Sequence, residues 1–202
     1  MGETPEPGTP QVDGPGARER ILAAAEELFA AAGFDATPTS RIAERAGVPK
    51  GLVHYYFKRK PELLTALVER LPEERIDPAA MIVAGDVAAS LHRLVDALDR
   101  ALGSSAVLSH LLWREADTHP AVLEALQARF DRMVGQIRGV LAMARPAGCA
   151  EADVDSAAHL LASAVSYRHS VARHAGDGPD AMHRELRFLA DALAAGAGAA
   201  PG

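Results

Sequence analysis

The sequence has almost no cysteine, few aromatic residues and no long hydrophobic run. Its single cysteine, Cys149, excludes an internal disulfide bond and a cysteine-rich metal site. The longest stretch without Asp, Glu, Lys or Arg, 101–113, is too short to cross a bilayer as a helix. The first 16 residues lack the apolar segment of a signal peptide. We therefore expect a protein of the reducing cytoplasm that has no membrane partner.

Aromatic residues make up only 4% of the chain, although 49% of its residues are hydrophobic, so Leu, Val and Ala must build the core. These residues recur at intervals of three and four, as on one face of an α-helix. No stretch shows the alternation of a half-buried β-strand. The pattern therefore predicts an all-α protein, and its 202 residues suit one or two domains.

Proline and glycine residues separate the periodic segments. The natural boundaries give a disordered tail over 1–16, an N-terminal domain over 17–71, a C-terminal domain over 72–196 and a second tail over 197–202. A helix start is predicted at Thr37-Pro38, where the threonine would cap the new helix. Other helices are predicted over residues 18–32, 62–70, 79–102, 105–117, 121–144, 153–174 and 180–195.

Lysine is scarce, and its distribution is informative. The three lysines of the chain all lie between residues 50 and 60. Residues 18–60 contain eight basic and five acidic residues, a net charge of +3, while the rest of the chain carries 13 − 22 = −9. Attraction to phosphate is screened beyond roughly 8 Å at physiological salt, so a local basic patch on an acidic protein can still bind DNA.

Residues 42–60, IAERAGVPKGLVHYYFKRK, have the layout of a helix-turn-helix. Ala43 is small enough for two helices to cross closely, and Gly47 can adopt the positive φ that reverses the chain. Val48 and Val53 would fill the angle between the helices. A plain αα-hairpin that packs against another protein is the alternative interpretation of this turn.

The outward side of the second helix would carry the contacts to DNA. Lys50 and Gly51 begin that helix, and His54 and Tyr55 follow one turn later, where their polar tips can reach phosphates or base edges. The basic run 58–60 follows, and Phe57 is expected in the core.

Residues 18–67 resemble the N-terminal domain of the TetR family of bacterial transcriptional regulators. The matching residues are RERILAAAEELFAAAGF at 18–34, Thr37, Ile42-Ala43, AGVPKG at 46–51, HYYFKRK at 54–60 and Leu63-Leu64. Two positions depart from the common pattern, because Leu52 replaces a frequent polar residue and His54 a frequent tyrosine. The resemblance implies DNA contacts from Thr39, Ser40, Lys50, Gly51, Leu52, His54, Tyr55, Tyr56 and Lys60.

The resemblance also implies a homodimer with an N-terminal three-helix helix-turn-helix DNA-binding domain and a C-terminal helical ligand-binding and dimerisation domain. Small residues on one of the last two helices and larger ones on the other suit a four-helix dimer bundle. The interface residues expected there are Ala157, Ala158, Leu161, Ala164, Val165, Leu186, Leu189 and Leu193. Candidate ligand contacts on the middle helices are His92, His110, Trp113, Phe130, Met133 and Tyr167.

The sequence offers no catalytic motif. It has no glycine-rich phosphate loop, no G-x-S-x-G and no histidine pair at the i, i+4 spacing of a helical zinc site, so we expect no catalytic residue, metal or other cofactor. The hypothesis is a ligand-responsive DNA-binding transcriptional regulator, a repressor that binds a palindromic operator as a dimer and is released by a small-molecule effector. The rival hypotheses are a helical interaction protein that never meets DNA and a helical enzyme on the same scaffold.

Overall fold

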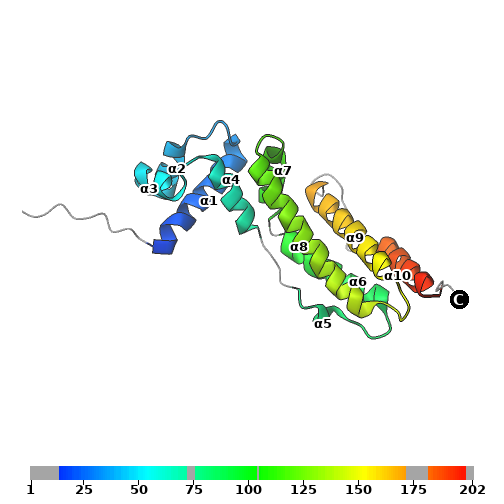
Figure 1. Cartoon of the computed structure of the whole chain (residues 1–202). Helices are drawn as coiled ribbons and strands as arrows, with labels where there is room; N and C mark the ends of the chain where they lie inside the picture. Colours follow the sequence, from blue (N-terminus) through cyan, green and yellow to red (C-terminus); the bar gives the residue numbers. More distant parts are fainter. Residues whose placement is uncertain (1–13, 72–75, 104, 172–181, 199–202) are drawn as a thin grey trace, which may run out of the picture. The chain divides into compact units, whose positions relative to one another are not determined.

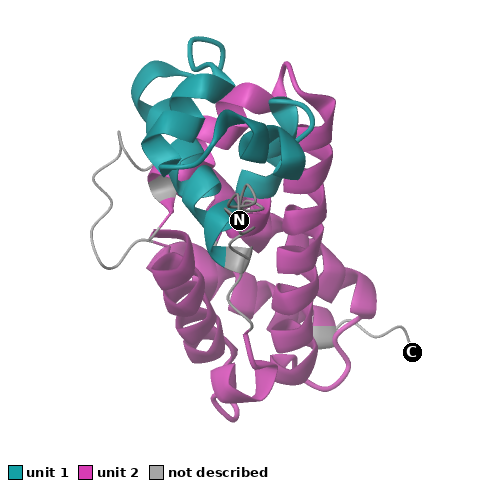
Figure 2. Ribbon diagram, turned by 90° about the vertical axis from the view of Figure 1, so that its left-hand side faces the viewer, with its two compact units in different colours: residues 1–67 teal, residues 68–202 magenta. Residues whose placement is uncertain are grey.

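The computed structural model describes residues 14–71, 76–103, 105–171 and 182–198, and every regular element in these ranges is a helix (Figure 1). The prediction of an all-α chain is therefore confirmed. The chain divides into two compact units, residues 1–67 and 68–202 (Figure 2). The predicted domain boundary at residue 71 falls four residues later, at the end of a helix that runs through the division. The predicted tails lie outside the described residues, apart from 14–16 and 197–198.

The N-terminal unit is built from α1 (Gly14–Ala32), α2 (Thr39–Ala46), α3 (Lys50–Tyr56) and the first part of α4 (Pro61–Arg70). The first helix begins inside the segment predicted as a tail. Its apolar face is buried, with Phe29 wholly covered and its ring 5.1 Å from that of Phe34 in an edge-to-face arrangement. This pair closes the corner after α1.

Thr37 has a different role from the one predicted. Helix α2 begins at Thr39 with Pro38 as its N-terminal cap, and no side chain caps it. The Thr37 hydroxyl is buried and donates a 2.8 Å hydrogen bond to the carbonyl of Gly33. Carbonyls at the end of a helix have no partner within the helix, so a buried threonine beyond α1 satisfies that end instead of the next start.

The C-terminal unit has a break in the segment predicted as one helix over 79–102. Gly85 has a φ of 75°, which turns the chain between α5 and α6. The Asp86 carboxylate then accepts a 2.8 Å hydrogen bond from the Ala89 amide and caps α6. The helices of this unit are α5 (Pro78–Met81), α6 (Val87–Gly103), α7 (Ala106–Ala116), α8 (Pro120–Ala144), α9 (Glu151–Val171) and α10 (His183–Gly198).

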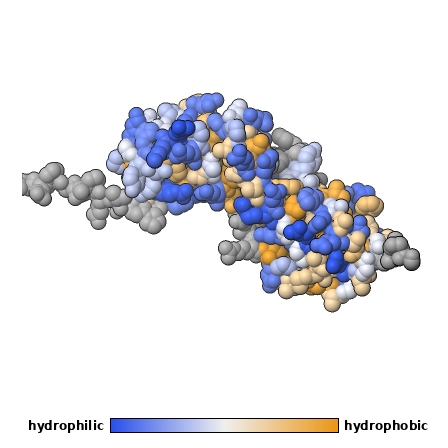
Figure 3. Space-filling model, viewed as in Figure 1, coloured by the Kyte–Doolittle hydropathy of each residue, from blue (hydrophilic) through white to orange (hydrophobic). Residues whose placement is uncertain are grey.

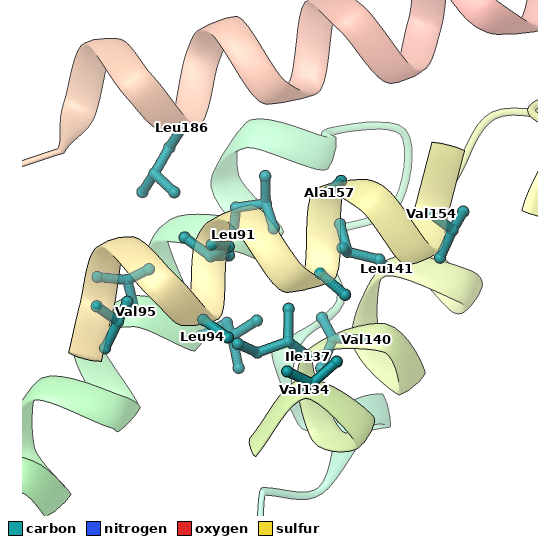
Figure 4. Close-up of a cluster of buried hydrophobic side chains, with 14 of the residues drawn as sticks. Leu91, Leu94, Val95, Val134, Ile137, Val140, Leu141, Val154, Ala157 and Leu186 are labelled. Carbon is teal, nitrogen blue, oxygen red and sulfur yellow. The ribbon is translucent and has the colours of Figure 1, made fainter. Parts of the chain in front are cut away.

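The core of the C-terminal unit lies between α6, α8 and α9, and α10 covers it with Leu186 (Figure 4). Leu91, Leu94, Ile137 and Leu161 are fully buried there. Each such side chain stabilises the fold by about 1.5–3 kcal/mol. Branched aliphatic residues and alanine supply most of this core, as the composition predicts. No helix among the described residues is long and apolar enough to cross a membrane.

Candidate nucleic-acid interface

The corner between α2 and α3 is formed as the sequence predicts. Gly47 has φ 64° and ψ 40°, in the left-handed region, and its amide donates to the Glu44 carbonyl at 3.1 Å. The amide of Val48 donates to the Ala43 carbonyl at 3.0 Å. A β-carbon added at Gly47 would meet nothing within 4 Å, so the backbone angle alone accounts for the glycine.

One side of the α2–α3 corner is buried. Ile42 and Ala43 of α2 and Val53 of α3 lie in the core of the N-terminal unit. Phe57, just after α3, is 5% exposed, which confirms its expected place in the core. The Arg18 guanidinium lies 5.6 Å from the centre of its ring. These contacts fix the orientation of α3.

The opposite side of α3 faces outward. Lys50, Gly51 and His54 are exposed, and Tyr55 keeps 69% of its surface. The ring of Tyr56 is half-buried and meets that of Tyr55 edge to face, with centres 5.2 Å apart. The face of the N-terminal unit in Figure 3 is largely hydrophilic. Of the other expected contacts, Ser40 is exposed and Thr39 and Leu52 are half-buried.

Lys60 is engaged within its own unit. Its ammonium donates to the Asp35 carbonyl at 3.3 Å and lies 4.2 Å from the centre of the Phe34 ring. A cation over an aromatic face contributes roughly 0.5–1 kcal/mol at an exposed site. Lys60 therefore ties the start of α4 to the α1–α2 corner.

Four exposed basic residues of this unit, Arg41, Lys50, Lys58 and Arg59, have side chains with no hydrogen bond or ion pair to any residue that the structure describes. Arg45, by contrast, is paired with Glu27 at 2.7 Å. Arg41 is absent from the contacts that the sequence suggested, although its place on the exposed side of α2 follows from the buried positions 42, 43 and 46. The unit therefore offers positive charge beside the outward side of α3.

Residues 21–67 match the family described as "Bacterial regulatory proteins, tetR family". The N-terminal unit of the chain therefore belongs to the TetR family. The HTH-type transcriptional regulator TtgR of Pseudomonas putida is 41% identical to it over 56 residues, which are 28% of this chain and 27% of TtgR. The aligned segment is thus about a quarter of the relative's own length.

Solved structures of this TetR-type fold extend over most of the chain. NalD of Pseudomonas aeruginosa, "the secondary repressor of MexAB-OprM multidrug efflux pump", has a TM-score of 0.55 and 20% identity over 89% of this chain and 96% of its own. SmeT, solved as a complex with triclosan, has a TM-score of 0.59 and 22% identity over 89% of this chain and 90% of its own. At such identities the likeness establishes the all-helical fold. The family consists of regulatory proteins, in agreement with the expectation that the chain is no enzyme.

The C-terminal unit contains a cavity of about 90 Å³ between α6, α7, α8 and α9. Three of the expected ligand contacts, Trp113, Phe130 and Met133, line it. The other expected contacts lie elsewhere: His110 and Tyr167 are exposed outside the lining. The remaining lining residues are Leu71, Leu98, Ala101, Leu102, Ser109, Leu126, Arg129, Gln136, Ser166 and His169.

His92, the last expected ligand contact, is paired with a distant histidine. Its Nε2 lies 2.8 Å from Nδ1 of His183, and its Nδ1 lies 2.7 Å from the Ala88 carbonyl. Arg187 in turn lies 3.0 Å from Nε2 of His183. The described residues contain no group of three or more His, Cys, Asp or Glu side chains that could hold a metal ion.

A cluster that the sequence did not suggest borders the cavity. Asp99 of α6 accepts a 2.8 Å hydrogen bond from Nε2 of His169 and forms an ion pair with Arg168. Burial opposes ionisation of Asp99, but the hydrogen bonds and charges of these two partners outweigh it and lower the pKa of the carboxyl. The only sequence signal for His169 is its position: it lies four residues after the buried Val165 and so continues the buried side of α9 with a polar side chain.

The expected dimer residues lie mostly in the core of their own subunit. Leu189 packs partly buried against that core, and Ala164 alone of the set is exposed. The large exposed apolar side chains of the same two helices are Leu160, Tyr167 and Phe188. For the buried members of the set, the apolar periodicity of α9 and α10 reflects packing within the chain rather than a surface for a partner. The buried members are Ala157, Ala158, Leu161, Val165, Leu186 and Leu193.

Proposed function

We propose that this TetR-family protein is a ligand-responsive repressor that binds a palindromic DNA operator as a homodimer in the cytoplasm. The observation that carries the proposal is the two-sided α3. Val53 anchors its inner side, while Lys50, His54 and Tyr55 project outward beside basic side chains that bind no described residue. Basic residues clustered on one face of a helix-turn-helix are the electrostatic footprint of a nucleic-acid-binding protein.

The outward residues make two kinds of contact with DNA in this proposal, to phosphates and to base edges. Lys50 and Arg41 provide cations for phosphate oxygens, which fix the position of the protein on DNA without reading sequence. His54 and Tyr55 carry polar tips that reach phosphates or base edges in the major groove. Leu52 can touch a thymine methyl group but reads no donor or acceptor.

Two such reading heads require a dimer, and we assign its interface to the exposed stripe of α9 and α10. Leu160, Ala164 and Tyr167 follow one another at three- and four-residue intervals, as one side of a helix requires. Phe188 of α10 is 72% exposed. Orange patches are interspersed over the C-terminal unit in Figure 3. A two-fold axis through such a stripe buries the same patch on both subunits.

The effector site of the proposed repressor is the cavity lined by Trp113, Phe130 and Met133. An apolar cleft with a few polar groups is the usual form of a small-molecule site. NalD is described as a repressor and SmeT binds triclosan, which supports the same division of roles here. Effector binding releases DNA when the effector prefers a conformation with the wrong spacing between the two heads.

The proposal is tested by selecting bound duplexes from a random DNA library with the full-length dimer. We expect a near-palindrome whose half-sites lie about 34–36 Å apart or somewhat more. Tyr55→Ala combined with Lys50→Ala should abolish enrichment, whereas Met143→Ala, at an exposed position of α8, should not change it. A dimer that enriches no sequence at low salt would instead support the interaction protein.

A further inference from the structure

One polar side chain of the proposed effector cavity, that of His169, has a defined hydrogen-bonding arrangement. His169 lines the cavity, and its Nε2 is held by the Asp99 carboxylate at 2.8 Å. Among the described residues no group forms a hydrogen bond with its Nδ1. His92 and His159, by contrast, direct Nδ1 to a carbonyl of their own helix, at 2.7 and 2.9 Å. Nδ1 is therefore the nitrogen of His169 that a ligand can use.

The Asp99 carboxylate determines which ring nitrogen of His169 carries a proton. A carboxylate only accepts hydrogen bonds, so Nε2 of His169 must be the protonated nitrogen. Arg168 forms an ion pair with the same carboxylate. In the neutral ring Nδ1 then carries a lone pair, and it accepts a hydrogen bond from a donor in the cavity. The fitting ligand group is therefore a hydroxyl rather than a carboxylate.

The rest of the lining narrows the ligand class. Trp113, Phe130 and Met133 form apolar walls suited to a flat ring, and methionine adapts to its outline. The lining contains no acidic side chain, while the Arg129 guanidinium is present and donates to the Leu71 carbonyl at 3.2 Å. This charge balance favours an oxygen that carries partial negative charge, as a phenol oxygen does, over an amine.

The size of the cavity favours a small ligand. Its volume is about 90 Å³. An engineered apolar cavity of about 150 Å³ accommodates benzene. The cavity is smaller than one that holds benzene, so a single aromatic ring enters it only when side chains of the lining move.

We propose that the cavity binds a single-ring phenol, whose hydroxyl donates to Nδ1 of His169 while Asp99 holds the opposite side of the imidazole. The inference rests on the proposed function, since it names the effector class of that same cavity. No covalent step is involved. Phenol specificity comes from one half-buried acceptor, Nδ1 of His169, that a ring without a hydroxyl leaves unsatisfied.

The test uses the full-length protein without DNA and follows the fluorescence of Trp113, the only tryptophan in the chain. Trp113 lines the cavity, so a ligand that enters changes its emission directly. p-Cresol is compared with toluene, which keeps the ring, with 4-methylanisole, which blocks the donor, and with 4-methylbenzoate, which replaces it by an anion. We expect p-cresol to bind at least about tenfold more tightly than each of the other three.

Two variants connect this preference to the histidine. His169→Phe keeps an aromatic ring but removes the acceptor. It should weaken the binding of p-cresol at least about tenfold and change the affinity for toluene by less than about threefold. His110→Gln, at an exposed residue of α7 outside the lining, is the matched control and should bind p-cresol as the parent does. Circular dichroism verifies that both variants fold, and toluene binding by His169→Phe verifies that its cavity survives.

Equal binding of p-cresol and toluene, tighter binding of 4-methylbenzoate, or an unaffected His169→Phe variant would each overturn the phenol assignment. A dimer that selects an operator but ignores p-cresol would overturn this inference and leave the proposed repressor intact. A protein that binds p-cresol through His169 but selects no DNA would overturn the repressor, because the fluorescence titration contains no DNA.

Discussion

The ammonium of Lys60 lies 4.2 Å from the centre of the Phe34 ring and donates one hydrogen bond to the Asp35 carbonyl. An ammonium has three donors, so these contacts position the charge without exhausting it. The residue therefore joins the corner after α1 to the start of α4 and keeps the capacity to bind a phosphate. Its two roles predict two separate effects of removing it.

Lys60→Ala should lower the free energy of unfolding by about 0.5–1 kcal/mol through the lost cation–π contact. It should also weaken binding to all DNA sequences alike and flatten the log–log salt dependence of binding by roughly one unit. Urea unfolding and salt-dependent fluorescence anisotropy measure the two effects independently. An unchanged salt slope would remove Lys60 from the phosphate contacts, and unchanged stability would show that the Phe34 contact contributes nothing.

Gly47 and Gly51 make a matched pair of substitutions on either side of the turn. Gly47 has a φ of 64°, so Gly47→Ala should cost about 1–2 kcal/mol of stability, although there is room for the methyl group. Gly51 lies in α3 with nothing within 4 Å of an added β-carbon, and Gly51→Ala should stabilise the helix by roughly 0.5–1 kcal/mol. We expect it nonetheless to weaken operator binding, because the proposed function places the backbone of Gly51 close to DNA. Thermal unfolding of both variants measures their stabilities, and a gel shift measures their operator binding. Equal stabilities of the two variants would contradict the turn geometry.

The exposed stripe of α9 predicts the oligomeric state. Tyr167→Glu introduces a charge at a position that is 70% exposed in the single chain and buried in the proposed dimer. The monomer should fold normally, whereas the dimer should dissociate and operator affinity should fall at least about 100-fold, since one reading head is lost from each complex. Sedimentation velocity measures the assembly. Met143→Glu, also at an exposed apolar residue, is the control, and a Tyr167→Glu variant that remains dimeric would place the interface elsewhere.

The N-terminal unit could be predicted closely because its function and its packing impose local patterns. The left-handed Gly47, the buried Val53 and the exposed Tyr55 all follow from spacing within one 19-residue stretch. Errors arose where a polar residue had two local partners to choose from. Thr37 could cap the next helix or satisfy the previous one, and burial of its hydroxyl favours the previous one.

The C-terminal unit was less predictable because its informative contacts join distant residues. Asp99 and His169 are 70 positions apart, and His92 and His183 are 91 apart, so no local spacing reveals either pair. Periodicity also identifies an apolar face without saying what covers it. The stripe containing Leu161 and Leu186 therefore read equally well as a dimer surface and as a core.

The Asp99 cluster predicts a specific dependence of stability on pH. Its partners lower the pKa of the carboxyl in the folded protein below the ordinary value of 3.8, so the folded state binds fewer protons than the unfolded state near that pH. The stabilisation is therefore complete above the ordinary value and is lost as pH falls through the lowered one. Asp99→Asn carries no charge at any pH, and it should be less stable than the parent by about 1–3 kcal/mol at neutral pH.

The difference between the parent and Asp99→Asn is the quantity to measure, because acid weakens many other carboxylate contacts equally in both proteins. Urea unfolding over a pH series should give a constant difference from neutral pH down to about pH 5, then a narrowing one below the ordinary carboxyl pKa. Asp131→Asn, at an exposed residue of α8, serves as the control and should track the parent throughout. If the Asp99→Asn difference stayed constant to the lowest pH at which both proteins fold, the carboxylate of Asp99 would not be held ionised by Arg168 and His169.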